Sequence, residues 1–143
     1  PMGATGDTAP LRVIQGPLTQ LNWPAQMSID PETGDIYVAN DIGHSVLVFK
    51  PTDKGNVAPT RVIKGDKTGL LNPSGVFVDK KHNELWVANF GNAKVCVFPL
   101  NANGNATPIR TIRSAPEGKL STKFGKVEAL AYDPTRDQVW VPN

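Results

Sequence analysis

The sequence predicts an all-β fold made of consecutive four-stranded antiparallel sheets, and three observations carry this prediction. A strand-like hexamer ending in Asn occurs three times, at residues 35–40, 84–89 and 138–143, with spacings of 49 and 54 residues. The chain holds 13 Gly and 13 Pro among 143 residues, which favours many turns. No segment shows a convincing helical period. Repeats of this length built from short strands are typical of β-propellers, so we expect about three blades of such a fold.

The first strand of each repeat along the chain, here called strand d, is expected at the outer edge of a blade. Its three copies are residues 11–14, 60–63 and 109–112, at offsets of 49. Residues 1–9 are small and polar, and we expect a flexible segment there.

Strand a comes next, and it is joined to the repeated hexamer, strand b, by a short turn. The copies of strand a are residues 26–30, 75–79 and 129–133. Each ends in an Asp that opens the turn, namely Asp30, Asp79 and Asp133. Pro follows the first and the third of these, and Asp before Pro suits a type I turn.

Strand c is predicted at residues 45–49 and 94–98, and the third repeat lacks a copy. The repeats therefore divide the chain into 10–58, 59–107 and a truncated 108–143. Strands b and c are apolar at nearly every position, as expected for sheets that are covered on both faces.

These residues resemble a known family. The repeat reads Pro-x-x-(apolar)-x-(apolar)-Asp, a turn, (apolar)-Tyr/Trp-Val-Ala-Asn, a loop, and (apolar)-x-Val-Phe. Over roughly residues 10–143 it resembles the NHL repeats and the broader lactonase-like and gluconolactonase-like six-bladed propellers. Many NHL repeats carry Asp after the Val-Ala pair, where this chain has Asn40 and Asn89. The resemblance implies a partial ring, half of a six-bladed propeller.

A partial ring leaves two raw edges, which favour aggregation, so two partner predictions stay open. The remaining blades of a longer chain could cover these edges, or a homodimer could close a six-bladed ring. The net charge is only +2 with both signs interspersed, so we expect no nucleic-acid partner. No apolar run is long enough to span a membrane. An extracellular or periplasmic location is expected from the resemblance.

The first candidate ligand site is the ring of Asn40, Asn89 and Asn143, which end the three copies of strand b. The resemblance implies that ligands bind on the face formed by the b–c and d–a loops. In some lactonase-like relatives this face holds a divalent cation, for which calcium would be the choice here. The alternative is that each Asn only bonds the backbone of its own loop. We predict no metal site and no cofactor from the spacing of ligands.

Other repeated residues each allow a functional and a structural interpretation. The turn Asp residues could be general bases or only turn formers. Arg12, Arg61 and Arg110 could bind an acidic partner or protect an outer edge. An aromatic position in strand b, occupied by Tyr37, Trp86 and Trp140, could stack a ligand or pack between blades. Cys96 replaces Leu47 of the first repeat and is interpreted as an apolar filler.

The function predicted is a binding or scaffold module that displays the b–c and d–a loops. The third d–a loop, residues 115–126, is five residues longer than its counterparts and contains the candidate partner contacts Lys119, Lys123 and Lys126. It could equally be a tolerated insertion. The alternative function is part of a metal-dependent lactonase-like hydrolase or lyase, and a third possibility is a purely architectural unit.

Overall fold

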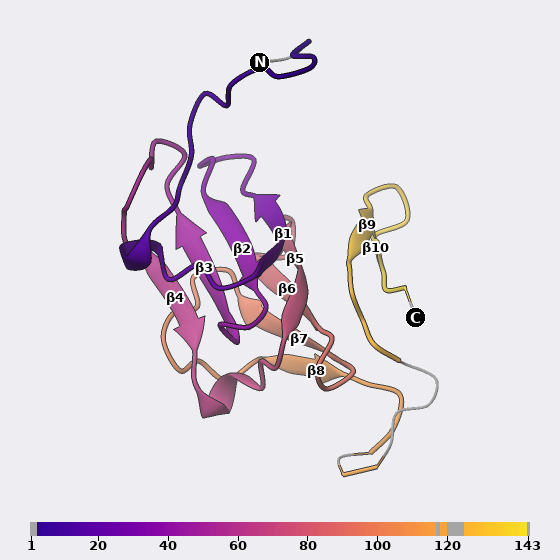
Figure 1. The fold of residues 1–143 in the computed structure, drawn as a ribbon. Coiled ribbons are helices and arrows are strands. Elements are labelled where there is room, and N and C mark those ends of the chain that lie inside the picture. Colours follow the sequence, from indigo (N-terminus) through magenta and orange to yellow (C-terminus); the bar gives the residue numbers. More distant parts are fainter. Residues whose placement is uncertain (1–2, 117, 120–124, 143) are drawn as a thin grey trace.

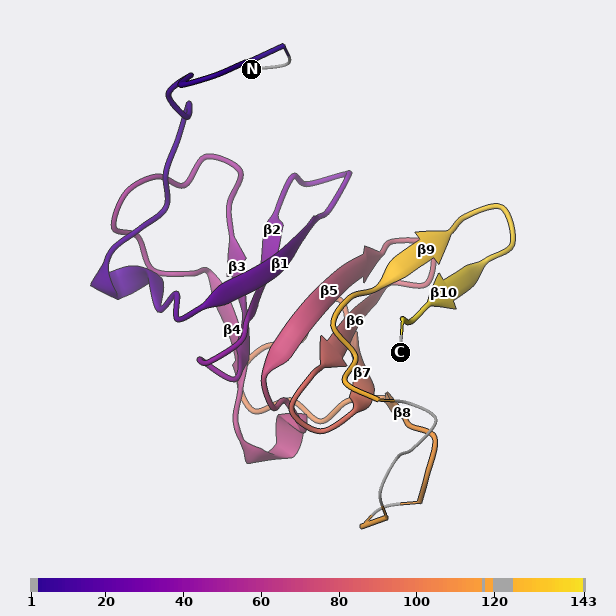
Figure 2. The ribbon, with the colours of Figure 1, turned by 45° about the vertical axis from the view of Figure 1, so that its right-hand side comes forward.

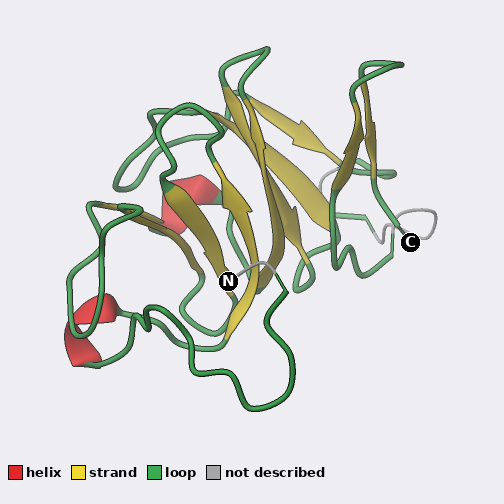
Figure 3. Ribbon diagram, turned by 90° about the horizontal axis from the view of Figure 1, so that it is seen from above, coloured by secondary structure: helices red, strands yellow, loops and turns green. Residues whose placement is uncertain are grey.

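Two four-stranded antiparallel sheets and one two-stranded hairpin follow one another along the chain in the computed structural model (Figure 1). The structure describes residues 3–116, 118–119 and 125–142. Within these residues the only helical segments are two short 3-10 turns, η1 (Pro17–Thr19) and η2 (Asp66–Thr68), which Figure 3 shows in red. The all-β prediction is therefore confirmed, as a partial propeller. In the same described residues no helix has the length and apolarity to cross a membrane.

Each sheet is a simple meander in which every strand pairs with the next one in sequence. Blade 1 consists of β1 (Pro24–Ile29), β2 (Ile36–Asn40), β3 (Ser45–Phe49) and β4 (Arg61–Lys64). Blade 2 consists of β5 (Pro73–Asp79), β6 (Glu84–Asn89), β7 (Lys94–Pro99) and β8 (Arg110–Ile112). The hairpin consists of β9 (Ala131–Asp133) and β10 (Gln138–Trp140).

The three units stack face to face, with β5 against β1 and β2 and with the hairpin on the far face of blade 2 (Figure 2). The larger core fills the space between the blades. Blade 1 contributes Tyr37 and Val48 to it, and blade 2 contributes Val76, Leu85 and Phe98. A smaller core joins buried residues of blade 2 to Val127 and Leu130, which precede the hairpin, and partly buried hairpin residues pack against it. Stacking explains why strands b and c are apolar on both faces.

Outer strands are tied to the following blade by a backbone bridge. Ile63 in β4 bridges to Gly104 in the c–d loop of blade 2, and Ile14 bridges to Gly55 in the equivalent loop of blade 1. The Ile14 bridge is all that forms from the strand predicted at residues 11–14, so that prediction is wrong. The reason is topological: β4 pairs with β3, which precedes it, whereas the described residues 3–10 form no strand.

The predicted turn role of the repeated Asp residues agrees with their hydrogen bonds. The Asp30 carboxylate accepts the amide hydrogens of Glu32 and Thr33, at 2.9 and 3.4 Å. Burial alone would raise the pKa of Asp30, but these amides and the ammonium of Lys80 outweigh it and lower the pKa. Asp133 accepts the Thr135 amide in the same way, at 2.9 Å.

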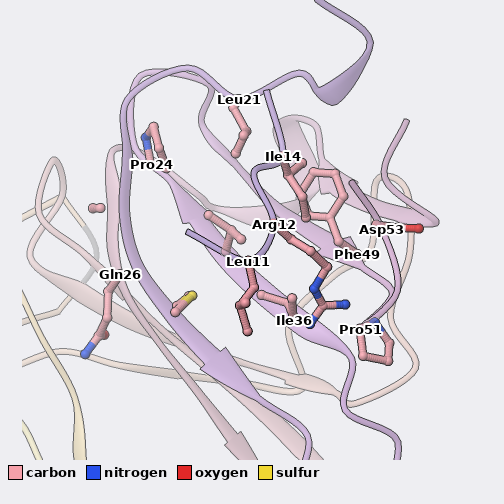
Figure 4. A pocket seen from close by; sticks show the side chains of 13 residues that line it. Leu11, Arg12, Ile14, Leu21, Pro24, Gln26, Ile36, Phe49, Pro51 and Asp53 are labelled. Atoms are coloured by element: carbon pink, nitrogen blue, oxygen red, sulfur yellow. The ribbon is translucent and has the colours of Figure 1, made fainter. Parts of the chain in front are cut away.

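No further sheet among the described residues covers the face of blade 1 that points away from blade 2. A cavity of about 680 Å³ lies on it, partly covered by the segment before η1 (Figure 4). Leu11 and Ile14 of this segment lie over Ile36 and Phe49 of the sheet. We call this the open face.

Candidate functional site

The loops at one edge of the stacked blades enclose a groove where blade 1, blade 2 and residues 126–129 meet. Two hollows of about 410 and 450 Å³ make it up, and they share Asp41 and Phe90 as lining residues. We call it the junction groove. Its informative side chains are Trp23, Asp41, Asn72, Phe90, Lys126 and Glu128.

The groove is lined by positions at which the repeat does not repeat. Trp23, Asn72 and Lys126 occupy one repeat position, three residues before the predicted strand a, at offsets of 49 and 54. Asp41 and Phe90 occupy another, immediately after strand b, at an offset of 49. Part of their surroundings repeats: Pro follows both Trp23 and Asn72, and Val-Ala-Asn precedes both Asp41 and Phe90. The side chains at these positions therefore vary beside residues that the repeat keeps. Loops that vary on a rigid scaffold are where recognition is found.

Buried Asn side chains hold these loops in place. The Asn40 side chain accepts the Asn22 amide hydrogen at 2.6 Å and donates to the Gln20 carbonyl at 3.0 Å and to the Ser45 hydroxyl at 2.9 Å. Asn89 accepts the Leu71 amide hydrogen at 3.0 Å. Each Asn thus ties the end of strand b to the d–a loop of its own blade, beside the groove.

Trp23 is exposed in a backbone conformation that disfavours it. Its φ is +59°, and 73% of its surface is accessible. The equivalent Asn72 has a φ of +48°. Asn tolerates this left-handed region, whereas a bulky aromatic residue there is a genuine outlier. The carbonyl of Trp23 holds the conformation by accepting the Asp41 amide hydrogen at 3.0 Å. Strain of this kind is found where function requires a particular side chain.

Polar contacts join the two blades beside the groove. Asn72 donates its side-chain amide to the Asp41 carboxylate at 2.7 Å, and its backbone N–H donates to Nδ1 of His44 at 3.0 Å. On the other side, the Lys126 ammonium lies over the Phe90 ring, 4.4 Å from its centroid. The groove therefore combines aromatic surface with one cation and two carboxylates, those of Asp41 and Glu128.

Comparison with known proteins identifies the family. The sequence matches the family "Lactonase, 7-bladed beta-propeller" over residues 4–143. The chain belongs to this lactonase propeller family. The blade number of that description is seven, where the resemblance to NHL-like propellers implied six, and the NHL assignment itself stays a prediction. No curated protein matches the sequence.

A solved structure shows the same fold. "Kuenenia stuttgartiensis Hydrazine Synthase" superposes with a TM-score of 0.62 at 15% sequence identity, over 96% of this chain and 32% of the other. The lactonase-family chain thus spans about a third of the length of that protein. At this identity the similarity concerns the fold alone.

The structure places the sequence-predicted residues of the lactonase-family chain as follows. Asn40 and Asn89 lie at equivalent strand ends, fully buried, with their amides bonded to the protein as described above. Asn143 and Lys123 lie outside the described residues. Lys119 is exposed, and its carbonyl accepts the Arg113 guanidinium at 3.0 Å. Of the two predicted lysines that the structure describes, Lys126 lines the junction groove and Lys119 does not.

The repeated Arg and aromatic residues have packing roles in the blades that are covered. Arg61 donates to the carbonyls of Leu100 and Ala102 and to the hydroxyl of Tyr37. Arg110 forms a two-point ion pair with Glu84, at 2.7 and 2.6 Å.

Cys96 also fits its structural interpretation. It is buried in the larger core, and burial raises the pKa of its thiol, so a thiolate is disfavoured. The groove residues Trp23, Asp41, Phe90 and Glu128 were missed by the sequence analysis. The signal that could have found them is the departure from the repeat at equivalent positions.

Proposed function

We propose that this chain is a ligand-binding module whose binding site is the junction groove. The observation that carries the proposal is the set of unrelated side chains at equivalent repeat positions around one groove, on loops clamped by buried Asn residues. Small-ligand sites combine apolar and aromatic walls with a few placed polar groups, and this groove has that character.

Family membership favours a second candidate function, the hydrolysis of a lactone by a longer protein of which this chain is a part. Calcium would then be the cofactor to test. The binding proposal concerns the described groove alone and requires no bond-breaking step there.

The proposed partners follow from the open face of blade 1. Either further blades of a longer chain or a second copy of this chain would cover it. Two copies of a three-repeat chain would supply six blades, whereas the family description has seven, which favours further blades.

The test is a thermal-shift screen of the chain against a panel of small metabolites, with calcium chloride as a separate arm. A ligand that binds the native state alone raises the melting temperature. We expect a metabolite to raise the melting temperature of the native chain and of Lys119→Gln, but not that of Phe90→Leu. We expect no lactone hydrolysis in a separate pH-stat assay. Saturable lactone hydrolysis by the chain, or shifts that Phe90→Leu leaves unchanged, would overturn the proposal.

A further inference from the structure

We propose that the junction groove binds an alkylammonium cation, and that Lys126 occupies the cation position as an internal competitor. The inference rests on the proposed binding function and names its ligand class. It starts from one contact: a flexible alkylammonium, that of Lys126, already lies 4.4 Å from the centroid of Phe90. Ammonium groups are attracted to the face of an aromatic ring at such distances.

The charges that line the groove favour a cation at this place. Of the titratable side chains lining it, Asp41 and Glu128 are acidic and Lys126 is the basic one. His44 is bonded to a lining residue, since its Nδ1 accepts the backbone amide hydrogen of Asn72 at 3.0 Å. If the Lys126 side chain leaves, the lining residues that the structure describes carry two carboxylates and no cation. An incoming ammonium then restores the balance.

Trp23 supplies a second aromatic surface in the same hollow as Phe90 and Lys126. Its left-handed backbone suits Asn better than Trp, and its side chain is mostly exposed. Folding therefore does not explain a Trp at this position. Aromatic side chains gathered around one point are the means by which proteins recognise quaternary ammonium groups.

Lys126 is attached to an exposed position of the d–a loop, so its side chain can exchange with solvent without unfolding a strand. A tethered group competes at a high effective concentration, on the order of millimolar for short tethers. Alkylammonium ligands should therefore bind the native chain weakly, and removal of the Lys126 ammonium should strengthen their binding. An anionic ligand would show the opposite change. Its binding would weaken on removal of the Lys126 ammonium, because it would lose the cationic contact that this group provides.

The experiment is an NMR titration of the full chain with choline, following the Trp23 indole N–H and the amides of Asp41 and Phe90. Lys126→Gln should tighten choline binding about tenfold, since the internal competitor is gone. Lys119→Gln, a matched change in the same loop, should leave the affinity unchanged. The neutral analogue in which tert-butyl replaces trimethylammonium should bind at least about tenfold more weakly.

Two further variants separate recognition from folding. Trp23→Asn should weaken choline binding several-fold while the melting temperature stays the same or rises, because Asn suits the left-handed backbone. Phe90→Leu should remove binding, with a dispersed amide spectrum as the control for folding. A parallel titration with N-acetyl-lysine methylamide identifies the kind of ligand. Tighter binding than that of choline indicates a lysine side chain of a peptide, and weaker binding indicates a small ammonium compound.

The outcomes that overturn the inference are distinct from those that overturn the binding function. Weaker or unchanged choline binding in Lys126→Gln, or equal binding of the neutral analogue, sinks the ammonium proposal. If choline shows no binding to any variant while another metabolite shifts the groove resonances, the ammonium inference fails and the binding function stands. If nothing shifts them, both fail.

Discussion

Blade 1 and blade 2 are built from the same repeat and pair their strands in the same order, yet their equivalent residues differ greatly in exposure. Met27 and Ile29 of β1 are 63% and 54% exposed, whereas Val76 and Val78 at the same positions of β5 are 2% and 5% exposed. The cause is the neighbouring blade. Blade 2 lies between blade 1 and the hairpin, whereas among the described residues the other face of blade 1 carries only the segment before η1. In a repeat protein, a residue on a sheet face is buried when a neighbouring repeat packs on that face, whatever its position in its own sheet.

The two junctions also differ in how their inner strands meet. At the first junction, Gln26 and Ser28 of β1 accept the amide hydrogens of Val76 and Val78, at 2.9 and 3.1 Å. At the second junction, Phe77 of β5 stacks on Tyr132, with ring centroids 5.2 Å apart. The same repeat thus accommodates either polar or aromatic contacts between neighbouring copies of strand a. This explains why strand a varies more than strand b.

The largest expected effect comes from equivalent truncations on the covered and the open faces. Leu85→Ala, in the core between the blades, should lower the free energy of unfolding by about 3 kcal/mol because it removes a fully buried side chain. Ile36→Ala, its equivalent on the open face, should cost about 1 kcal/mol or less, because the site is already partly exposed.

Urea unfolding of both variants at two protein concentrations measures this difference. Equal losses would contradict the comparison, since they would mean that the open face is covered in solution. A concentration dependence of the Ile36→Ala loss alone would identify a second copy as the cover.

The next prediction concerns the Asn clamps. Here the larger loss of stability is expected in blade 1 and the smaller one in blade 2. Asn40→Ala should cost about 2 kcal/mol, because it leaves the Asn22 amide and the Gln20 carbonyl without their partner. Asn89→Ala should cost about 1 kcal/mol, since its second contact, to the Val87 carbonyl, is long at 3.3 Å. Thermal unfolding followed by circular dichroism gives both values. A larger loss for Asn89→Ala would show that Asn40 is not a clamp.

The repeated strands and turns of this chain could be predicted from the sequence, whereas the junction groove could not. The period of 49 residues, the Asp turns and the strand order could be predicted because each depends on residues close in sequence. The strand predicted at residues 11–14 failed because a strand needs a partner, and its propensity is the same with or without one. The junction groove was missed because it joins residues from three repeats. It is visible in the sequence only where equivalent positions disagree, as at Trp23 and Asn72.

A smaller effect separates the two outer-strand arginines. Arg61→Lys should cost about 1 kcal/mol at any ionic strength, because a lysine cannot keep both carbonyl bonds to the c–d loop of blade 2. Arg110→Lys should cost about 0.5 kcal/mol at low salt and less at high salt, because its ion pair with Glu84 is half exposed. Unfolding at low and at molar salt checks this. A salt-dependent loss in Arg61→Lys would contradict the carbonyl-bonded role.

The smallest effect is a pH dependence confined to the turn of the β9–β10 hairpin. Hydrogen bonds from Lys81 and from the Tyr132 hydroxyl lower the pKa of Asp137. The ionised carboxylate therefore favours the folded state above its ordinary pKa of about 3.9, and this contribution is lost as the pH falls through the lowered value. In turn, the hydrogen bond to Asp137 raises the pKa of Tyr132 to about 12, so the neutral phenol favours folding below about pH 10 and this contribution is lost as the pH rises through about 12.

Asp137→Asn removes the charge and keeps a residue that tolerates the φ of +56° at this position. We expect it to move the pKa of Tyr132 toward the ordinary value of about 10, as read from the Tyr132 ring resonances. Its melting temperature should fall below that of the native chain at pH 7, and the two should converge as the pH falls through the lowered pKa of Asp137. Asp7→Asn, outside the sheets, is the matched control. If the Tyr132 pKa stays near 12 in Asp137→Asn, the hydrogen bond to this carboxylate is not its cause, and the hairpin turn is held by packing against blade 2 instead.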